Sequence, residues 1–390
     1  MKSAKDNYEL LEGSQAIART IKNLEPAVIS AYPITPQTHI VEILAKYKAD
    51  GLVNCEYVRA ESEFAAASIV LGASAAGARV YSATSSQGLL LMTEVIFNIA
   101  GMRLPVVMTC ANRSVSAPIN IWNDHSDVMA IRDTGWILLF AANHQEAVDQ
   151  HVLAYKLAEK LNLPVMVNVD GFIITHSYES VIIPELSLIK KYLPDYNPLL
   201  GTYLNPDAPV TLGAFFTPDY YQEARQTLHQ DLLASQTVIK EEYKLYKKLS
   251  ARQEAGMAKP AIDNGLIEYY GPKKPNLILV ALGSVIGTIQ ETIKSENIGL
   301  LKIKTYRPFP GEEIAKILSS AKNVAVIEKA ISLGNMGPLY SDIRGALTKN
   351  NRLNISNHIV GLGGRDVTKK IIKGIIKSAS GRANEAKFWG

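Results

Sequence analysis

Short apolar runs, each followed by a segment with helical periodicity, recur through most of the chain. The runs are not alternating, which is typical of strands that are buried on both faces, and the helical segments supply the crossovers that parallel strands need. This pattern predicts an α/β fold in which helices cover both faces of a parallel sheet. The first set of predicted strands covers 27–32, 53–59, 79–83, 105–110, 136–141 and 164–169.

The alternation is interrupted between residues 175 and 260 and then resumes. Prolines and tyrosines occur there without a period, and a long polar helix is predicted from about 218 to 252. We therefore expect a first domain over 1–255, with an extension at 175–255 that packs on neighbouring domains or chains, and a smaller α/β domain over 262–390. Further strands are predicted at 276–281, 299–305, 323–327 and 356–361, and helices at 8–24, 36–48, 62–77, 144–161, 285–294, 311–320 and 366–379.

Charge and hydropathy exclude some classes of partner. The net charge is +4 over 390 residues, without a concentrated basic stripe before the last helix, which argues against nucleic acid. No apolar run approaches the ~20 residues that span a bilayer, and the N-terminus has no secretory pattern, so we expect a cytoplasmic protein without a membrane contact. The last helix carries a lysine cluster that is read as a solvated face, with a docking patch as the alternative: Lys369, Lys370, Lys373 and Lys377.

The two cysteines, Cys55 and Cys110, fall in separate predicted strands, and no Cys-x-x-Cys pair occurs. The chain therefore cannot bind an iron–sulfur cluster in the usual four-cysteine way. We expect both cysteines to be small buried apolar fillers.

The stretch from Ala31 to Thr38 reads Ala-Tyr-Pro-Ile-Thr-Pro-Gln-Thr and joins the first predicted strand to a helix. In open α/β sheets, ligands bind at the carboxyl ends of the strands, where this stretch lies. Pro36 suits the first helical position, so Thr35 is predicted to be the helix N-cap. The Thr35 hydroxyl can cap the helix, face a ligand or do both.

Charged residues stand at the ends of two further strands. Glu63 opens a helix dense in small residues, where it either only favours the helix dipole or acts chemically. Arg113 either pairs with a surface acid or offers two parallel donors to a carboxylate ligand. In the loop that follows, His125 and Asp127 are two possible metal ligands without a third, so a role in ordering the loop is favoured over a metal site or an acid–base pair.

Together, the 31–38 stretch, Ser62-Glu63 and Arg113-Ser114 resemble the thiamine-diphosphate-dependent 2-oxoacid:ferredoxin oxidoreductases, the pyruvate:ferredoxin oxidoreductase family. The resemblance implies the alpha subunit of a multi-subunit enzyme that converts pyruvate, coenzyme A and oxidised ferredoxin to acetyl-CoA, CO₂ and reduced ferredoxin. A branched-chain 2-oxoisovalerate:ferredoxin oxidoreductase alpha subunit is one alternative. A scaffold chain that has lost its chemistry is another, against which the joint presence of Thr35, Glu63 and Arg113 argues.

The resemblance also implies a role for each site residue. Thr35 contacts the 2-oxoacid, and Arg113 binds its carboxylate. Glu63 is both catalytic and cofactor-binding, because it hydrogen-bonds the pyrimidine ring nitrogen of thiamine diphosphate. A supporting layer around these residues is expected from Tyr32, Gln87, Asn120, His125 and Asp127.

The same family divides its thiamine diphosphate site between two domains. Here the resemblance covers the pyrimidine-side domain and, after it, a transketolase C-terminal-like domain. It does not extend to the diphosphate-side domain. The usual diphosphate and Mg²⁺ motif is absent, with Asp170-Gly171 the nearest fragment, so no metal site is expected on this chain. A beta subunit is expected to hold the diphosphate and Mg²⁺. The iron–sulfur clusters are assigned to other subunits; gamma and ferredoxin-like delta subunits and ferredoxin complete the expected partners, with coenzyme A as co-substrate.

Overall fold

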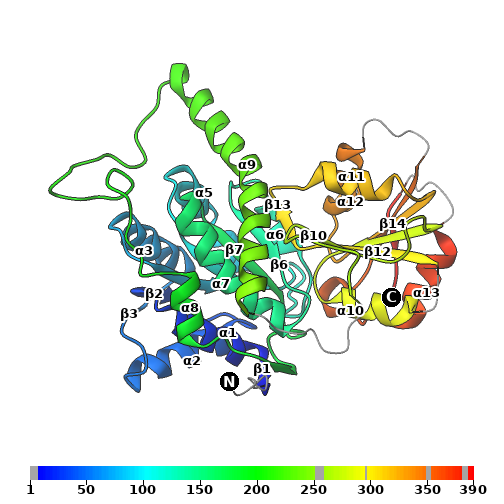
Figure 1. The fold of residues 1–390 in the computed structure, drawn as a ribbon, viewed down its shortest axis with the longest axis horizontal. Coiled ribbons are helices and arrows are strands. Elements are labelled where there is room, and N and C mark those ends of the chain that lie inside the picture. Colours follow the sequence, from blue (N-terminus) through cyan, green and yellow to red (C-terminus); the bar gives the residue numbers. More distant parts are fainter. Residues whose placement is uncertain (1–7, 251–258, 295–296, 348–352, 380–384) are drawn as a thin grey trace.

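The computed structural model describes residues 8–250, 259–294, 297–347, 353–379 and 385–390. Within them, two seven-stranded sheets stand side by side (Figure 1). The first has the order β13-β6-β7-β5-β4-β2-β3, and its strands are parallel except for β13. Its early strands are β2 (Val28–Ala31), β3 (Glu56–Arg59), β4 (Val80–Thr84), β5 (Val107–Asn112), β6 (Ile137–Phe140) and β7 (Val165–Asp170).

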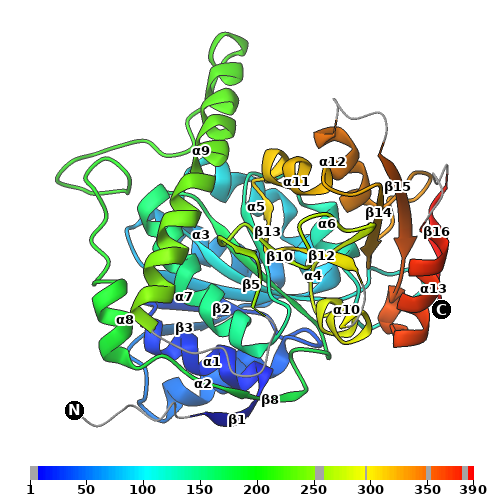
Figure 2. The ribbon, with the colours of Figure 1, turned by 45° about the vertical axis from the view of Figure 1, so that its right-hand side comes forward.

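Helices cover both faces of this sheet, as the sequence predicts (Figures 1 and 2). One face carries α1 (Gly13–Leu24), α2 (Thr38–Ala49) and α7 (His144–Leu161), and the other carries α3 (Glu63–Ala75), α4 (Ser86–Leu91), α5 (Thr93–Gly101) and α6 (Ser126–Ala130). Because β2 leads outward to β3 whereas β4 leads the other way to β5, the strand order reverses between β2 and β4. Such a reversal opens a crevice at the carboxyl ends of the two strands.

The second sheet has the order β16-β15-β14-β11-β12-β10-β9, with an antiparallel edge at β10 and β9. Helices α10 (Val285–Ile293) and α13 (Lys369–Ser378) cover one face, and α11 (Gly311–Leu318) and α12 (Pro338–Ala346) lie on the other side (Figure 1). Its strands are β9 (Ile262–Asp263), β10 (Ile267–Tyr270), β11 (Leu277–Ala281), β12 (Ile298–Ile303), β14 (Asn323–Glu328), β15 (Asn354–Ile359) and β16 (Lys387–Phe388). The predicted α/β class is confirmed in both sheets.

The two sheets share one apolar core. A single cluster of buried side chains runs from Val107 and Val167 in the first sheet to Val280 and Val326 in the second. The chain also crosses back after β12, because β13 (Thr305–Arg307) pairs antiparallel with β6. The prediction of one strand over 299–305 is therefore wrong at its end, since residue 305 already belongs to the other sheet.

The predicted extension contains α8 (Leu186–Tyr192) and α9 (Pro218–Ser250). Buried positions along α9 fall on one helical stripe, at Leu228, Ser235, Ile239, Glu242 and Tyr246, and the helix packs on α7 and α8. The N-terminal half of α9 and the preceding loop project from the body (Figures 1 and 2). The predicted long helix is confirmed up to residue 250, and its last predicted residues, 251–252, lie outside the described residues.

One helix, predicted over 8–24, is wrong at its start. Residues Glu9–Glu12 form β1, which pairs antiparallel with β8 (Tyr178–Val181), and α1 begins at Gly13. The backbone at Gly13 approaches the Ile174 carbonyl so closely that a Cβ would lie 1.9 Å from its oxygen. Tertiary pairing and this close approach, rather than local periodicity, set the helix start.

The cysteines, the lysine cluster and the hydropathy of the helices can also be compared with the sequence analysis. Cys55 and Cys110 are free and buried, as predicted, although Cys55 lies just before β3 rather than in it. The cluster Lys369, Lys370, Lys373 and Lys377 is exposed on α13, as a solvated face requires. Among the described residues, no helix is long and apolar enough to cross a membrane.

Candidate active site

The predicted site residues meet where the strand order reverses. Thr35 follows β2, Arg113 follows β5, and the turn at 84–88 joins β4 to α4. Because β2, β4 and β5 are neighbours and parallel, their carboxyl ends share one edge of the sheet. Thr35 and Arg113 therefore lie at the edge of the sheet where the topology predicts a crevice.

Arg113 bridges the turn after β2 and the loop after β5. Its Nη1 donates to the Thr35 carbonyl at 2.8 Å, and its Nε donates to the Asn120 carbonyl at 3.1 Å. The residue is only 8% exposed, and among the described residues no carboxylate forms a salt bridge with its guanidinium. Burial lowers the pKa of Arg113, an effect that Asp127 opposes, but a guanidinium stays charged at any physiological pH. A surface ion pair is therefore not the explanation for Arg113.

The turn after β2 differs from the prediction. Helix α2 begins at Thr38 with Gln37 as its N-cap, so the expected N-cap role of Thr35 is wrong. Gln37 is fully buried, and its Nε2 donates to the Ala83 carbonyl at 2.7 Å and the Tyr32 carbonyl at 3.2 Å. This side chain fixes the turn to β4 and delays the helix start, which leaves Thr35 exposed at the site edge.

Glu63 is the first residue of α3, and the Ser62 hydroxyl caps that helix by accepting from the Ala65 amide at 3.2 Å. Glu63 is 8% exposed, whereas its neighbour Glu61 is exposed to solvent. The Glu63 carboxylate lies against the turn after β4, because a Cβ on Gly88 would be 2.7 Å from both its Oε1 and Thr84 Oγ1.

The Glu63 carboxylate has no hydrogen-bond partner among the residues that the structure describes, and neither does the buried Thr84 hydroxyl. Buried polar groups in folded proteins are nearly always hydrogen-bonded. A buried carboxylate at a crevice can accept a hydrogen bond from a ligand N–H, which is the chemistry that this position offers.

Asp127 holds the two strand-end turns together. Its fully buried carboxylate accepts from the backbone amides of Ser86 and Arg113, both at 3.0 Å, and from Asn112 Nδ2 at 3.0 Å. Burial raises the pKa of Asp127, and these hydrogen bonds oppose that rise. With every contact directed at the protein, the geometry agrees with the loop-ordering interpretation.

The remaining predicted residues surround the same edge. Asn120 Oδ1 accepts from the Ser114 hydroxyl at 3.0 Å, while its Nδ2 donates to the Gly363 carbonyl at 3.1 Å and so links this loop to the second sheet. Gln87 is half-buried and accepts from the Ser86 hydroxyl. Tyr32 is 39% exposed and contributes its backbone carbonyl to Gln37.

His125 belongs to a buried polar cluster between the sheets. Its Nε2 lies 2.6 Å from Asp170 Oδ1, while Lys329 Nζ donates to Asp170 Oδ2 at 2.7 Å and to Asn123 Oδ1 at 2.9 Å. The Ser284 amide also donates to Asp170, at 3.0 Å. Burial alone would raise the pKa of Asp170, but the charges of Lys329 and His125 outweigh it and hold this pKa well below its ordinary value. The Asp170 carboxylate is thus committed to protein partners.

Sequence reasoning missed Gln37 and Lys329. Gln37 stands inside the motif itself, directly after Thr35-Pro36, but its burial and its contact with the Ala83 carbonyl depend on a strand far along the chain. Lys329 lies 159 residues from Asp170 along the chain, and nothing local distinguishes it from a surface lysine.

Two family models match the chain. The first, pyruvate flavodoxin/ferredoxin oxidoreductase, thiamine diphosphate-binding, matches residues 19–244, which is more than half of the chain. The chain belongs to this family. The second, pyruvate:ferredoxin oxidoreductase core domain II, matches residues 276–372. The resemblance found in the sequence is thereby confirmed.

Relatives in this family align over nearly the whole chain. Pyruvate synthase subunit PorA of Methanosarcina barkeri is 44% identical over 97% of this chain and 95% of its own length. The PorA of Methanocaldococcus jannaschii is 43% identical, with 98% and 97% covered. Ketoisovalerate oxidoreductase subunit VorA of Pyrococcus furiosus is 37% identical, also with 98% and 97% covered.

The family fold is also found in a solved structure. A 2-oxoglutarate:ferredoxin oxidoreductase from Magnetococcus marinus superposes with a TM-score of 0.69 at 21% identity, covering 96% of this chain. The present chain spans 65% of that structure's chain. At this identity the likeness concerns the fold, and it agrees with the two α/β units described above.

Proposed function

We propose that this chain is the alpha-type subunit of a cytoplasmic pyruvate synthase, the pyruvate:ferredoxin oxidoreductase of its family. The observation that carries the proposal is that the buried Glu63 carboxylate has no described hydrogen-bond partner, while the Arg113 guanidinium is held by backbone carbonyls, one of them that of Thr35. Support for pyruvate comes from the relatives named for that substrate, which are 39–44% identical, against 37% for the branched-chain relative.

Glu63 fits the pyrimidine side of thiamine diphosphate. Its buried carboxylate forms no hydrogen bond with the described residues and can accept a ring N–H, and the lack of a side chain at Gly88 keeps the space beside it open. When bound, the cofactor supplies the carbanion chemistry of decarboxylation. Glu63 then holds the proton at the pyrimidine ring nitrogen, which is the acid–base task for which a positioned carboxylate is needed.

Arg113 fits the carboxylate of a 2-oxoacid. Its Nε and Nη1 donate to backbone carbonyls, so Nη2 is the nitrogen left to donate to a ligand, and the neighbouring Thr35 is exposed. These backbone contacts fix the guanidinium plane, which reduces the rotamer freedom lost when substrate binds. The Thr35 hydroxyl would contact the same substrate from the other side.

The diphosphate and Mg²⁺ do not fit this chain, because the nearest acidic motif residue, Asp170, is already bound by Lys329 and His125. We assign them to a beta subunit, and the iron–sulfur clusters to other subunits of gamma and ferredoxin-like delta type. Coenzyme A would accept the acetyl group, and ferredoxin would accept the electrons. We further infer that 1–255 is the pyrimidine-side domain and 262–390 the transketolase C-terminal-like domain, which the two family matches support.

The test is the activity of the assembled complex with a panel of 2-oxoacids, measured as coenzyme-A-dependent reduction of ferredoxin. We expect the highest kcat/KM with pyruvate. A higher value with 3-methyl-2-oxobutanoate would instead assign the branched-chain reaction. An assembled, cofactor-loaded complex that uses no 2-oxoacid would contradict a catalytic role and favour the scaffold alternative.

A further inference from the structure

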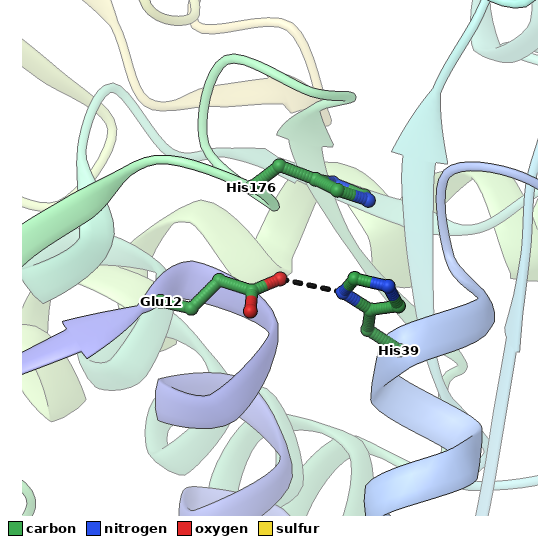
Figure 3. Close-up of side chains that lie close together, drawn as sticks. All are labelled: Glu12, His39 and His176. Atoms are coloured by element: carbon green, nitrogen blue, oxygen red, sulfur yellow. Dashed lines mark hydrogen bonds and ion pairs between the residues drawn. The ribbon is translucent and has the colours of Figure 1, made fainter.

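Three potential metal ligands converge behind the turn that carries Thr35. Glu12 ends β1, His39 lies in the first turn of α2, and His176 lies between β7 and β8 (Figure 3). One ligand atom from each residue lies within 4.8 Å of the other two. Figure 3 shows the Glu12 carboxylate directed at the His39 ring, with the His176 ring above them, the three side chains coming from separate elements.

The contacts inside this cluster leave nitrogen lone pairs available. His39 Nδ1 lies 2.7 Å from Glu12 Oε1, and the two imidazole centroids are 4.6 Å apart. His176 Nδ1 lies 2.7 Å from the hydroxyl of the buried Thr175. A metal-binding histidine usually donates its other ring N–H to such an oxygen, which fixes the tautomer, so His176 would bind through Nε2.

The surroundings suit a metal ion with one open position. Glu12 is 9% exposed, so its carboxylate is largely withdrawn from water, whereas the His39 side chain is 45% exposed and admits solvent.

We propose that Glu12, His39 and His176 bind one divalent transition-metal ion of the zinc class, with water as the fourth ligand. Two imidazoles and a carboxylate are ligands that zinc prefers, whereas Mg²⁺ and Ca²⁺ require mostly oxygen. Ligand atoms at 2.0–2.2 Å from zinc stand about 3.3 Å apart in a tetrahedron, so small side-chain movements close the site.

The ion would clamp the outer side of the candidate active site. His39 stands four residues after Thr35, and His176 follows the turn that begins at Gly171. That turn packs on the Thr35-Pro36 segment so closely that a Cβ on Gly171 would lie 2.5 Å from Pro36 Cγ. Bound metal would therefore hold the β2 and β7 turns together without entering the crevice.

The experiment is a titration of Zn²⁺ into the full-length chain, which is first dialysed against a chelator. Calorimetry measures the binding. A parallel titration with Co²⁺ reads the visible absorption of the bound ion. We expect one Zn²⁺ per chain, no competition from excess Mg²⁺, and a rise in apparent unfolding temperature with added Zn²⁺.

The variants are His39→Ala and His176→Ala, with His229→Ala as the control, because His229 is exposed on α9. Each histidine variant removes a proposed ligand and should weaken Zn²⁺ binding by about 100-fold or more. Thr175→Val removes only the hydroxyl that contacts His176 and should weaken binding by roughly 10- to 100-fold. His39 is itself exposed, so its variant keeps the fold. Absence of a one-to-one Zn²⁺ site, or unchanged affinity in His39→Ala, would overturn the proposal.

Discussion

At the scale of single residues, burial separates two glutamates that lie two positions apart. Glu61 is exposed, whereas Glu63 is 8% exposed and faces the turn at Gly88. Leaving a buried carboxylate without a hydrogen-bond partner costs about 1–3 kcal/mol or more. A buried carboxylate that has no protein partner is therefore expected to bind a ligand. The proposed proton-holding role therefore belongs to Glu63.

Glu63→Gln should leave the complex assembled and nearly inactive. The amide keeps the shape of the side chain but cannot hold the proton at the pyrimidine nitrogen, and such a loss lowers kcat by roughly 10²–10⁴. Steady-state turnover with pyruvate measures this, and Glu61→Gln is the matched control, expected to be near wild type. Turnover of Glu63→Gln within a few-fold of wild type would show that Glu63 does not have the proposed catalytic role.

Arg113→Lys should impair substrate use far more than cofactor binding. Lysine keeps the charge but loses the fixed planar donors, so the apparent affinity for pyruvate should fall about 10- to 100-fold, the equivalent of one charge-assisted hydrogen bond. Kinetics against pyruvate concentration check this. Thr35→Val should be milder, and the double variant non-additive if both residues touch one ligand. An unchanged KM and kcat in Arg113→Lys would place the carboxylate clamp on the partner chain.

At the scale of secondary-structure elements, a buried ionic cluster joins the two sheets. Lys329 from the end of β14 and His125 before α6 both reach Asp170 at the end of β7. The depressed pKa of Asp170 means that its contribution to stability is present above its unfolded pKa of about 4 and is lost as the pH falls below that value.

Lys329→Met should therefore be strongly destabilising at pH 7. It leaves the Asp170 carboxylate buried without its main counter-charge, a change that costs about 3–5 kcal/mol. Urea unfolding of the full chain measures the loss. Lys373→Met, at an exposed lysine on α13, should stay within about 0.5 kcal/mol of wild type. Equal stability of the two variants would show that the cluster does not hold the sheets together.

A second buried carboxylate makes stability depend on pH with the opposite sign. Glu328 accepts from the Leu339 and Tyr340 amides at the start of α12 and from Asn357 Nδ2, yet burial outweighs these bonds and raises its pKa to about 8. Between the unfolded pKa near 4.5 and pH 8, the folded state binds more protons than the unfolded state, so stability falls as pH rises.

Comparing wild type with Glu328→Gln isolates this effect, since other titrating groups cancel. The free energy of unfolding of wild type should fall by about 1 kcal/mol per pH unit relative to the variant between pH 5 and pH 7.5. Urea unfolding at several pH values provides the measurement. A difference between the two proteins that is constant with pH would mean that Glu328 is ionised in the fold.

The sequence predicted the central strands and the residues of the crevice because both depend on local patterns. Continuous apolar runs mark buried parallel strands, and the strand-end positions of Thr35 and Arg113 follow from them. The N-cap at Gln37 was missed because the buried contact of its side chain with the Ala83 carbonyl overrides the ordinary preference for threonine and proline. Strands β1 and β13 were missed because they are defined by partners far along the chain.

At the scale of the whole molecule, we propose that the chain contributes half of a cofactor site. Glu63, Thr35 and Arg113 follow the carboxyl ends of strands of the first sheet, whereas the carboxylate of the nearest fragment to a diphosphate motif, Asp170, is bound by Lys329 and His125. The exposed arm formed by the loop before α9 and the first half of that helix is available for contacts with other chains (Figure 2). Our proposal therefore requires a site that is shared with another subunit.

Calorimetric titration of thiamine diphosphate in the presence of Mg²⁺ tests this central claim most directly. It is carried out on this chain alone, on the proposed beta subunit and on the assembled complex. We predict tight binding only for the complex, with weak or undetectable binding to this chain, and a reduced affinity in a complex that carries Glu63→Gln. Tight, Mg²⁺-dependent binding to this chain alone would contradict the division of the site between two subunits.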